Sequence, residues 1–199
     1  MHTRAKMSKL NDMNDMGEFN LARVLEHELA TTDLIAPTIY RLAERRSDWT
    51  EGCRAFETRF RRTKRGSERT GELIITWGLG EIALDYGYGT VRDDLRKLAK
   101  AKNEDQITEL AAIGTAFCMM VVLMPGERIT KVTAKGDRGD FFLNGRRDEM
   151  MEISGTVRDN LDSRFSRKKR QILLNKMLRK AIVNVSRFAS ATSRLERVK

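Results

Sequence analysis

The hydrophobic period of the sequence changes abruptly after residue 124, and this change restricts the folds open to the chain. Glu104–Met124 is apolar on nearly every side beyond its first turn, which predicts a helix buried in a core. Pro125-Gly126 ends that helix. Ile129–Ala134 then alternates in side-chain character, which is a strand pattern. A buried helix is therefore expected to lead directly into a sheet.

Further strands follow. Asp140–Asn144 and Glu149–Thr156 are apolar, aromatic and β-branched enough to be strands, and they join around Asn144-Gly145. We expect a helix over Asn160–Lys180, a fourth strand over Ala181–Phe188, and a polar tail that adds at most an edge strand. The order helix–strand–strand–strand–helix–strand predicts an α+β or α/β fold, in which a four-stranded mixed sheet is flanked by helices.

The N-terminal half has helical spacing throughout. The expected helices are Phe19–Leu29, Asp33–Arg46, Thr50–Arg62, Glu72–Tyr86 and Val91–Ala101. The sequence thus predicts an α-helical region over residues 1–103 and an α/β core over residues 104–199, with a basic helix near the C-terminus. No linker marks the boundary between them.

The positive charge is concentrated in one part of the chain. Of the net charge of +10, all comes from residues 156–199, which hold 13 Lys/Arg and 3 Asp/Glu. The first 155 residues hold 25 basic and 25 acidic residues and are neutral. A localised basic excess is typical of a protein that binds a polyanion such as nucleic acid. The alternative is a solvated helix with no such partner.

The cysteines and apolar runs indicate a compartment. Cys53 and Cys118 are far apart in sequence, so a disulfide framework or a cysteine zinc site is not expected, in keeping with a reducing environment. The first residues lack the apolar segment of a signal peptide. The run Leu110–Met124 has 15 residues, fewer than the roughly 20 of a membrane span. We expect a soluble, cytoplasmic protein without a membrane partner.

Two carboxylates, Asp140 and Glu152, lie on the second and third strands of the predicted sheet. A two-residue Asn-Gly turn pairs Leu143 with Arg146 and sends the two carboxylates to opposite faces. A three-residue loop, Gly145–Arg147, places them directly opposite each other, with Cβ atoms about 4.5–5.5 Å apart. Only the second register lets them share a divalent cation.

In that second register each face of the sheet has a defined set of residues. One face carries Asp140, Phe142, Met150, Glu152 and Ser154, and the other carries Phe141, Leu143, Met151 and Ile153. Both faces are largely apolar, so the sheet should be covered on both sides. Buried carboxylates then need a metal ion or cationic neighbours.

The helix after the third strand can supply such cations. One narrow stripe holds Arg164, Lys168, Gln171 and Asn175, beside an apolar stripe. Three more cations, Arg167, Lys169 and Arg170, spread over the outer face. The stripe either faces the carboxylates or simply keeps the helix soluble.

These residues resemble the PD-(D/E)XK nuclease-like superfamily over about residues 104–188. Asp140 matches the metal-binding aspartate of the second strand, and Glu152 matches the acidic residue of the (D/E)XK tripeptide. The tripeptide is Glu152-Ile153-Ser154, so Ser154 stands where lysine is expected, and Gly139 precedes Asp140 in place of proline.

The resemblance implies a restriction-endonuclease-like core and a metal-dependent mechanism. Asp140 and Glu152 would hold Mg²⁺ or Mn²⁺, with Glu109 (or Glu104) as an additional acidic ligand. The alternative role of this glutamate is a favourable charge near a helix N-terminus. Lys168 would deliver the ammonium group from the adjacent helix. The expected nucleic-acid contacts are Arg164, Arg167, Lys168, Lys169, Arg170 and Gln171.

Three hypotheses follow. The first is a divergent nuclease that cleaves phosphodiester bonds with Asp140, Glu152 and Lys168. The second is a catalytically inactive module of the same fold that binds nucleic acid or a protein partner, for example in phage defence or mobile-element maintenance. The third is a non-enzymatic interaction protein, such as a homodimer, whose basic helix is only solvated. Because lysine is absent at Ser154, the sequence leaves catalysis open.

Overall fold

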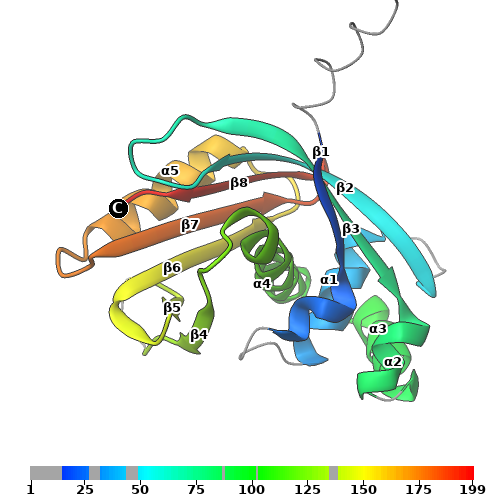
Figure 1. Ribbon diagram of the computed structural model, residues 1–199. Helices are drawn as coiled ribbons and strands as arrows, with labels where there is room; N and C mark the ends of the chain where they lie inside the picture. The colour runs from blue at the N-terminus through cyan, green and yellow to red at the C-terminus, as the bar shows by residue number, and fades with distance from the viewer. Residues whose placement is uncertain (1–14, 27–31, 44–48, 87, 102, 135–138) are drawn as a thin grey trace, which may run out of the picture.

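The structure is a computed structural model that describes residues 15–26, 32–43, 49–86, 88–101, 103–134 and 139–199. It is a mixed α+β protein (Figure 1). The strands are β1 (Asp15–Asn20), β2 (Glu51–Arg61), β3 (Arg69–Gly78), β4 (Ile129–Val132), β5 (Phe141–Leu143), β6 (Arg146–Thr156), β7 (Lys180–Arg187) and β8 (Thr192–Arg197). The helices are η1 (Leu21–Glu26, a 3₁₀ helix), α1 (Thr32–Leu42), α2 (Leu79–Tyr86), α3 (Tyr88–Lys100), α4 (Glu104–Leu123) and α5 (Leu161–Leu173).

The sheet is twice as wide as the sequence predicts. Its eight described strands lie in the order β1-β3-β2-β8-β7-β6-β5-β4. β8 joins the two halves, because it pairs in parallel with β2 and antiparallel with β7. The expectation of a four-stranded sheet is therefore wrong, and one sheet crosses the boundary that was placed between residues 103 and 104.

Helices cover both faces of the sheet at β6 and β7. Met151 and Ile153 belong to the core that includes α1 and α4, whereas Met150 packs with α5 residues such as Phe165. Successive residues of a strand point to opposite faces, so α4 and α5 lie on opposite sides of β6. Figure 1 shows the same arrangement. The face assignment of the apolar residues of β5 and β6 made from the sequence is thus confirmed.

The expectation that the N-terminal half is entirely helical is wrong. Thr50–Arg62 was expected to be a helix and forms β2, and Glu72–Tyr86 divides between β3 and α2. Phe19–Leu29 divides between the end of β1 and η1, and its last residues lie outside the described part of the chain. Residues four apart share a face in a helix and also in a strand, so the buried pair Phe56 and Phe60 fits both. Only the buried Thr58 between them reveals the two-residue period.

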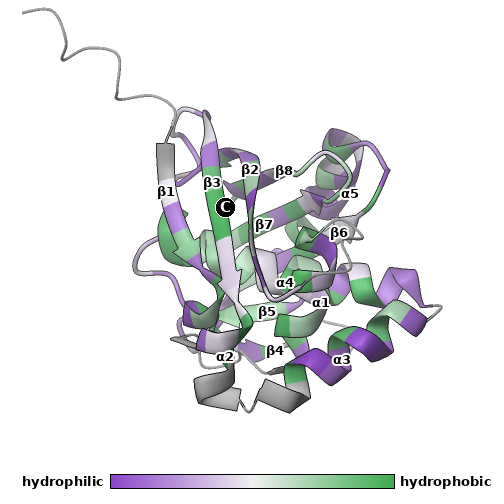
Figure 2. Cartoon of the chain, turned by 90° about the vertical axis from the view of Figure 1, so that its right-hand side faces the viewer, coloured by the Kyte–Doolittle hydropathy of each residue, from purple (hydrophilic) through white to green (hydrophobic). Residues whose placement is uncertain are grey.

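The C-terminal elements differ from the expectation in length and place. α5 ends at Leu173, before the predicted end at Lys180. The expected polar tail instead forms β8, an interior strand that pairs with β2 on one side and β7 on the other. Its residues Leu195 and Glu196 are buried. In Figure 2 the outer helix α3 is largely hydrophilic, and its buried residues Val91 and Leu95 lie one turn apart.

Close backbone packing fixes α4 against β6. A Cβ atom at Gly155 would lie 2.5 Å from the carbonyl oxygen of Thr108 and 2.9 Å from Cβ of Ala112. Glycine therefore allows an approach that a side chain would prevent. By length and composition α4 could cross a membrane, but 67% of its most apolar window is buried inside the protein. The helix brings Glu109 to the edge of β6.

Candidate metal and phosphodiester site

The β5–β6 hairpin combines the two registers considered for it. Leu143 pairs with Arg146, and Asn144 and Gly145 have φ angles of 53° and 70°, as in a tight type I′ turn. The register then shifts, so that Phe142 pairs with Met150. This bulge restores the pairing of the longer loop, which carries Asp140 alongside Glu152.

Asp140 lies where β5 stops pairing with β6. Its backbone N–H donates to the carbonyl of Met151 at 2.9 Å, and its Oδ2 accepts the N–H of Ile153 at 2.8 Å. Further along, Gly155 donates its N–H to Oε2 of Glu109 at 3.3 Å. The carboxylates of Asp140 and Glu109 thus accept hydrogen bonds from β6 backbone N–H groups that have no partner on the short strand β5.

Glu152 is 0% exposed and points to the α5 face. Its Oε1 accepts a hydrogen bond from Nζ of Lys168 at 2.5 Å, and the Lys168 side chain is 20% exposed. Its Oε2 is buried and has no hydrogen-bond partner among the described residues. A buried carboxylate oxygen without a partner is costly and rare in native proteins.

The pKa values of both carboxyls are raised. Burial, and then the charge of Asp140, raise the pKa of Glu152 to about 7, although Lys168 opposes this. Burial also raises the pKa of Asp140, while the N–H of Ile153 and the charge of Lys168 act in the other direction. Glu109 raises both pKa values. The three acidic groups are therefore close enough to interact electrostatically.

Ser154 takes part in a second network. Nε of Arg164 donates to Oγ of Ser154 at 2.9 Å, and Nη2 of Arg164 donates to Oε1 of Glu109 at 2.9 Å. Nη1 of Arg164 also pairs with Asp159. A guanidinium group therefore lies beside the position where the resembled motif carries lysine. The sequence signal for this contact is the i, i+4 spacing of Arg164 and Lys168, which puts both on one flank of α5.

A pocket of about 560 Å³ opens beside these groups. It is lined, among others, by Glu109, Ile113, Val132, Asp140, Ile153 and Lys168, and we call it the carboxylate pocket. Of the residues expected to be catalytic or metal-binding, Asp140, Lys168 and Glu109 line it. Glu152 is not among the lining residues; it is buried and accepts a hydrogen bond from Lys168. Glu104, the alternative to Glu109, instead pairs with Arg41 of α1.

The expected nucleic-acid residues of α5 divide into three groups. Arg164 and Lys168 face β6 and are held by the carboxylates. Arg167, Arg170 and Gln171 are exposed. Lys169 lines a different pocket. Asn175, from the same predicted stripe, lies beyond the end of α5, and its amide contacts Sδ of Met150 at 3.9 Å.

The donor set fits a Mg²⁺ or Mn²⁺ ion held by two carboxylates. Among the described residues, no group of three or more His, Cys, Asp and Glu side chains could hold a metal ion. Mg²⁺ is commonly bound by only one or two carboxylates, with water and substrate phosphates as its other ligands. Asp140 and Glu152 are the two carboxylates that could serve as such ligands here.

Comparison with known proteins adds no relative. No family model, curated protein or solved structure matches the chain.

Proposed function

We propose that this protein is a divergent PD-(D/E)XK-like nucleic-acid-binding protein with a Mg²⁺- or Mn²⁺-dependent phosphodiesterase site. The order α4-β4-β5-β6-α5-β7 supports the proposal. β4, β5 and β6 pair antiparallel, and β7 returns parallel to β6 after α5. This is the restriction-endonuclease-like order that the resemblance implies. The proposal places the protein in the cytoplasm.

The observation that carries the proposal is the incomplete pairing of Glu152. An ion pair that serves only stability would gain from satisfying both carboxylate oxygens, because a buried oxygen without a partner costs free energy. Here one oxygen meets Lys168 and the other has no described partner, while Asp140 lies alongside. The pair therefore leaves one buried carboxylate oxygen of Glu152 without a described partner.

The residues have distinct roles in the proposed reaction. Asp140 and Glu152 would hold the ion, which when bound polarises the phosphodiester and lowers the pKa of attacking water. Lys168 holds Oε1 of Glu152 and offers a positive charge to an anionic phosphorus centre. Arg164 fixes Glu109 and Ser154 and so positions the rim of the pocket.

The test is cleavage of plasmid and single-stranded DNA and RNA with Mg²⁺ or Mn²⁺. We expect Asp140→Asn and Glu152→Gln to lower cleavage by at least about 100-fold, because each removes a ligand or its charge. Lys168→Met should also lower it. The matched control is Asp105→Asn, which changes an exposed carboxylate in the first turn of α4. Equal loss in the control, or cleavage unaffected by Asp140→Asn, would refute the assignment.

A second candidate is a catalytically inactive module that binds nucleic acid. Ser154 in place of lysine favours it, and so does the use of Asp140 and Glu109 as acceptors for backbone N–H groups of β6. This candidate predicts salt-sensitive binding without cleavage in either metal. Absence of both binding and cleavage at low salt would instead favour a protein interaction, including self-association.

A further inference from the structure

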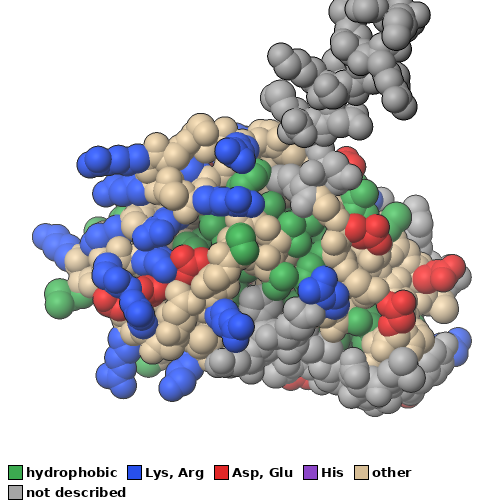
Figure 3. Space-filling view, viewed as in Figure 1, with side chains coloured by type: hydrophobic (Ala, Val, Ile, Leu, Met, Phe, Trp, Pro, Cys, Tyr) green, Lys and Arg blue, Asp and Glu red, His purple; other side chains and the backbone are tan. Residues whose placement is uncertain are grey.

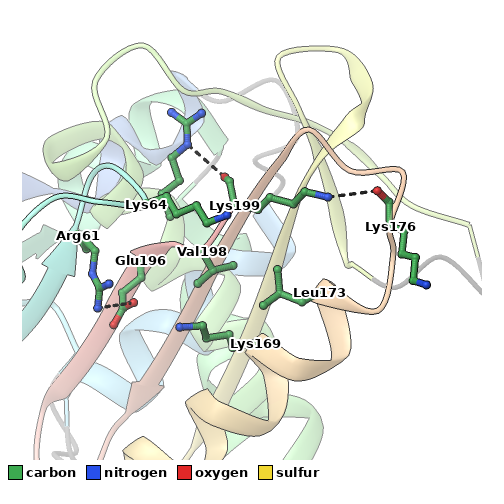
Figure 4. Close-up of a pocket in the computed structure, with 9 residues that line it drawn as sticks. Arg61, Lys64, Lys169, Leu173, Lys176, Glu196, Val198 and Lys199 are labelled. Carbon is green, nitrogen blue, oxygen red and sulfur yellow. Dashed lines mark hydrogen bonds and ion pairs between the residues drawn. The ribbon is translucent and has the colours of Figure 1, made fainter.

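A second pocket, of about 500 Å³, lies between α5, β8 and the β2–β3 hairpin (Figure 4). We call it the basic pocket. Six cationic side chains line it: Arg61, Lys64, Lys169, Lys176, Arg197 and Lys199. They come from segments that are distant in sequence, so the fold gathers this charge at one place.

The basic pocket is only weakly neutralised. Glu196 is the one acidic side chain among its described lining residues, and this group is already engaged by Arg61 at 3.1 Å and by Arg194. In the described part of the chain, the side chains of Arg197 and Lys199 donate hydrogen bonds to the main-chain oxygens of Lys199 and Lys176, respectively. The remaining three amines have no ion-pair partner among the described residues: Lys64, Lys169 and Lys176. Unpaired cations around a concave surface attract an anion of high charge density.

The basic pocket and the carboxylate pocket lie on opposite flanks of α5. The buried stripe Leu161, Phe165 and Ile172 faces the sheet. Residues of a helix turn about 100° per position. Lys168 therefore projects on the β6 flank, where it meets Glu152, and Lys169 projects on the other flank, where it lines the basic pocket.

Cationic and polar side chains connect the two flanks. Arg167, Arg170 and Gln171 are exposed on the outer face of α5, between the flanks. In Figure 3 Lys and Arg gather on the side of the molecule where Figure 1 shows α5, the β2–β3 hairpin and the C-terminal strand. Asp and Glu are more frequent on the opposite side of that view.

We propose that the basic pocket binds a backbone phosphate of a nucleic-acid strand that crosses the outer face of α5 from the carboxylate pocket. A helix with its side chains is about 10–12 Å wide, which corresponds to at least three to four nucleotides of a stacked strand. The inference rests on the proposed function, because it takes the strand bound here to be the one presented to Asp140 and Glu152. It adds a phosphate site remote from the reacting group.

The test is binding of a fluorescent single-stranded oligodeoxynucleotide, measured by anisotropy in EDTA at several salt concentrations. A triple variant removes the unpaired amines of the basic pocket: Lys64→Ala, Lys169→Ala and Lys176→Ala. A matched control removes three exposed cations of α3: Arg92→Ala, Lys97→Ala and Lys100→Ala. We expect the pocket variant to bind at least about tenfold more weakly and its log–log salt slope to fall by about 0.7, the value for one lost phosphate contact on a single strand. The control should match wild type.

Wild-type affinity and salt slope in the pocket variant would overturn the proposal. So would binding to vesicles of anionic phospholipid with no binding of the oligonucleotide. If the triple variant does not fold, Lys169→Glu alone decides the question, since it must weaken binding more than Arg92→Glu does.

The use of EDTA separates this inference from the proposed catalysis. Weakened binding in the pocket variant, with no cleavage by wild type in either metal, supports the basic pocket and refutes the nuclease. Normal binding in the pocket variant, with cleavage that depends on Asp140, refutes the basic pocket and leaves the nuclease.

Discussion

Replacing Glu152 by glutamine should stabilise the protein in neutral and alkaline solution but not in acid. The folded-state pKa of Glu152 is about 7, against an ordinary value of 4.5, so the folded state retains a proton that the unfolded state releases between these values. Stability is therefore lost as the pH rises through that window. Glutamine does not titrate, so it removes this loss while keeping the size of the side chain.

The magnitude follows from the two pKa values. Between pH 5 and pH 8 the stability of Glu152→Gln relative to wild type should rise by at most about 2.5 kcal/mol. The figure is an upper limit because the half-buried Lys168 and the neighbouring pocket admit some solvent screening. Urea unfolding of both proteins at several pH values in EDTA measures the difference, with the exposed Glu72→Gln as control.

A bound divalent ion should reduce this pH dependence in wild type. An ion at Asp140 and Glu152 favours the ionised carboxylates, so Mg²⁺ or Mn²⁺ should stabilise wild type most at high pH. Glu152→Gln should respond less. Parallel pH curves for wild type and variant would refute the account of a buried, poorly paired carboxylate. A metal response that is equal in both proteins would refute the role of Glu152 as a ligand.

Three further outcomes are expected. Gly155→Ala should cost about 1–3 kcal/mol in urea unfolding, because its Cβ would meet the carbonyl of Thr108; unchanged stability would show that α4 can retreat freely. Burial alone would raise the pKa of Glu149, but hydrogen bonds from lysine, asparagine and arginine neighbours lower it to about 2. Its ionised form therefore stabilises the fold fully above the ordinary pKa of 4.5, and this contribution is lost as the pH falls towards 2. Glu149→Gln should lower the free energy of unfolding by about 3 kcal/mol at pH 7 and by progressively less in acid. The same loss of stability in acid as at pH 7 would contradict this. Of the two thiols, the exposed Cys53 should react with a disulfide reagent in native protein, whereas Cys118, buried and with a raised pKa, should react only after denaturation; native reaction of both would contradict its burial.

The helices and strands of much of the C-terminal half could be predicted, because there the local sequence pattern and the packing in the fold favour the same elements. The apolar helix, the alternation after it, and the Asn-Gly turn each have a local cause, and the resulting strands β4 to β7 lie close to their expected ranges. The face assignment also held for Phe142 and Met150, because the bulge in β6 returns the register to the one that shares a face.

The remaining features depend on contacts between distant parts of the chain. β8 looks like a polar tail because five of its six residues, all but Leu195, are polar or charged. It becomes an interior strand only through pairing with β2, which lies more than a hundred residues earlier. The basic pocket was missed for the same reason, since its cations share no local motif.

The candidate site residues can be named from the sequence, but whether they come together depends on the matching residue spacings of β6 and α5. Residues two apart on a strand are about 6.6 Å apart, and residues four apart on a helix are about 6 Å apart. Glu152 and Ser154 therefore match Lys168 and Arg164 when α5 runs antiparallel to β6, and each helix cation meets one strand residue. A lysine at position 154 would have to compete with Arg164 for the space beside Glu109. α5 thus supplies the positive charges of both Arg164 and Lys168. For this reason a serine at position 154 is compatible with the proposed site.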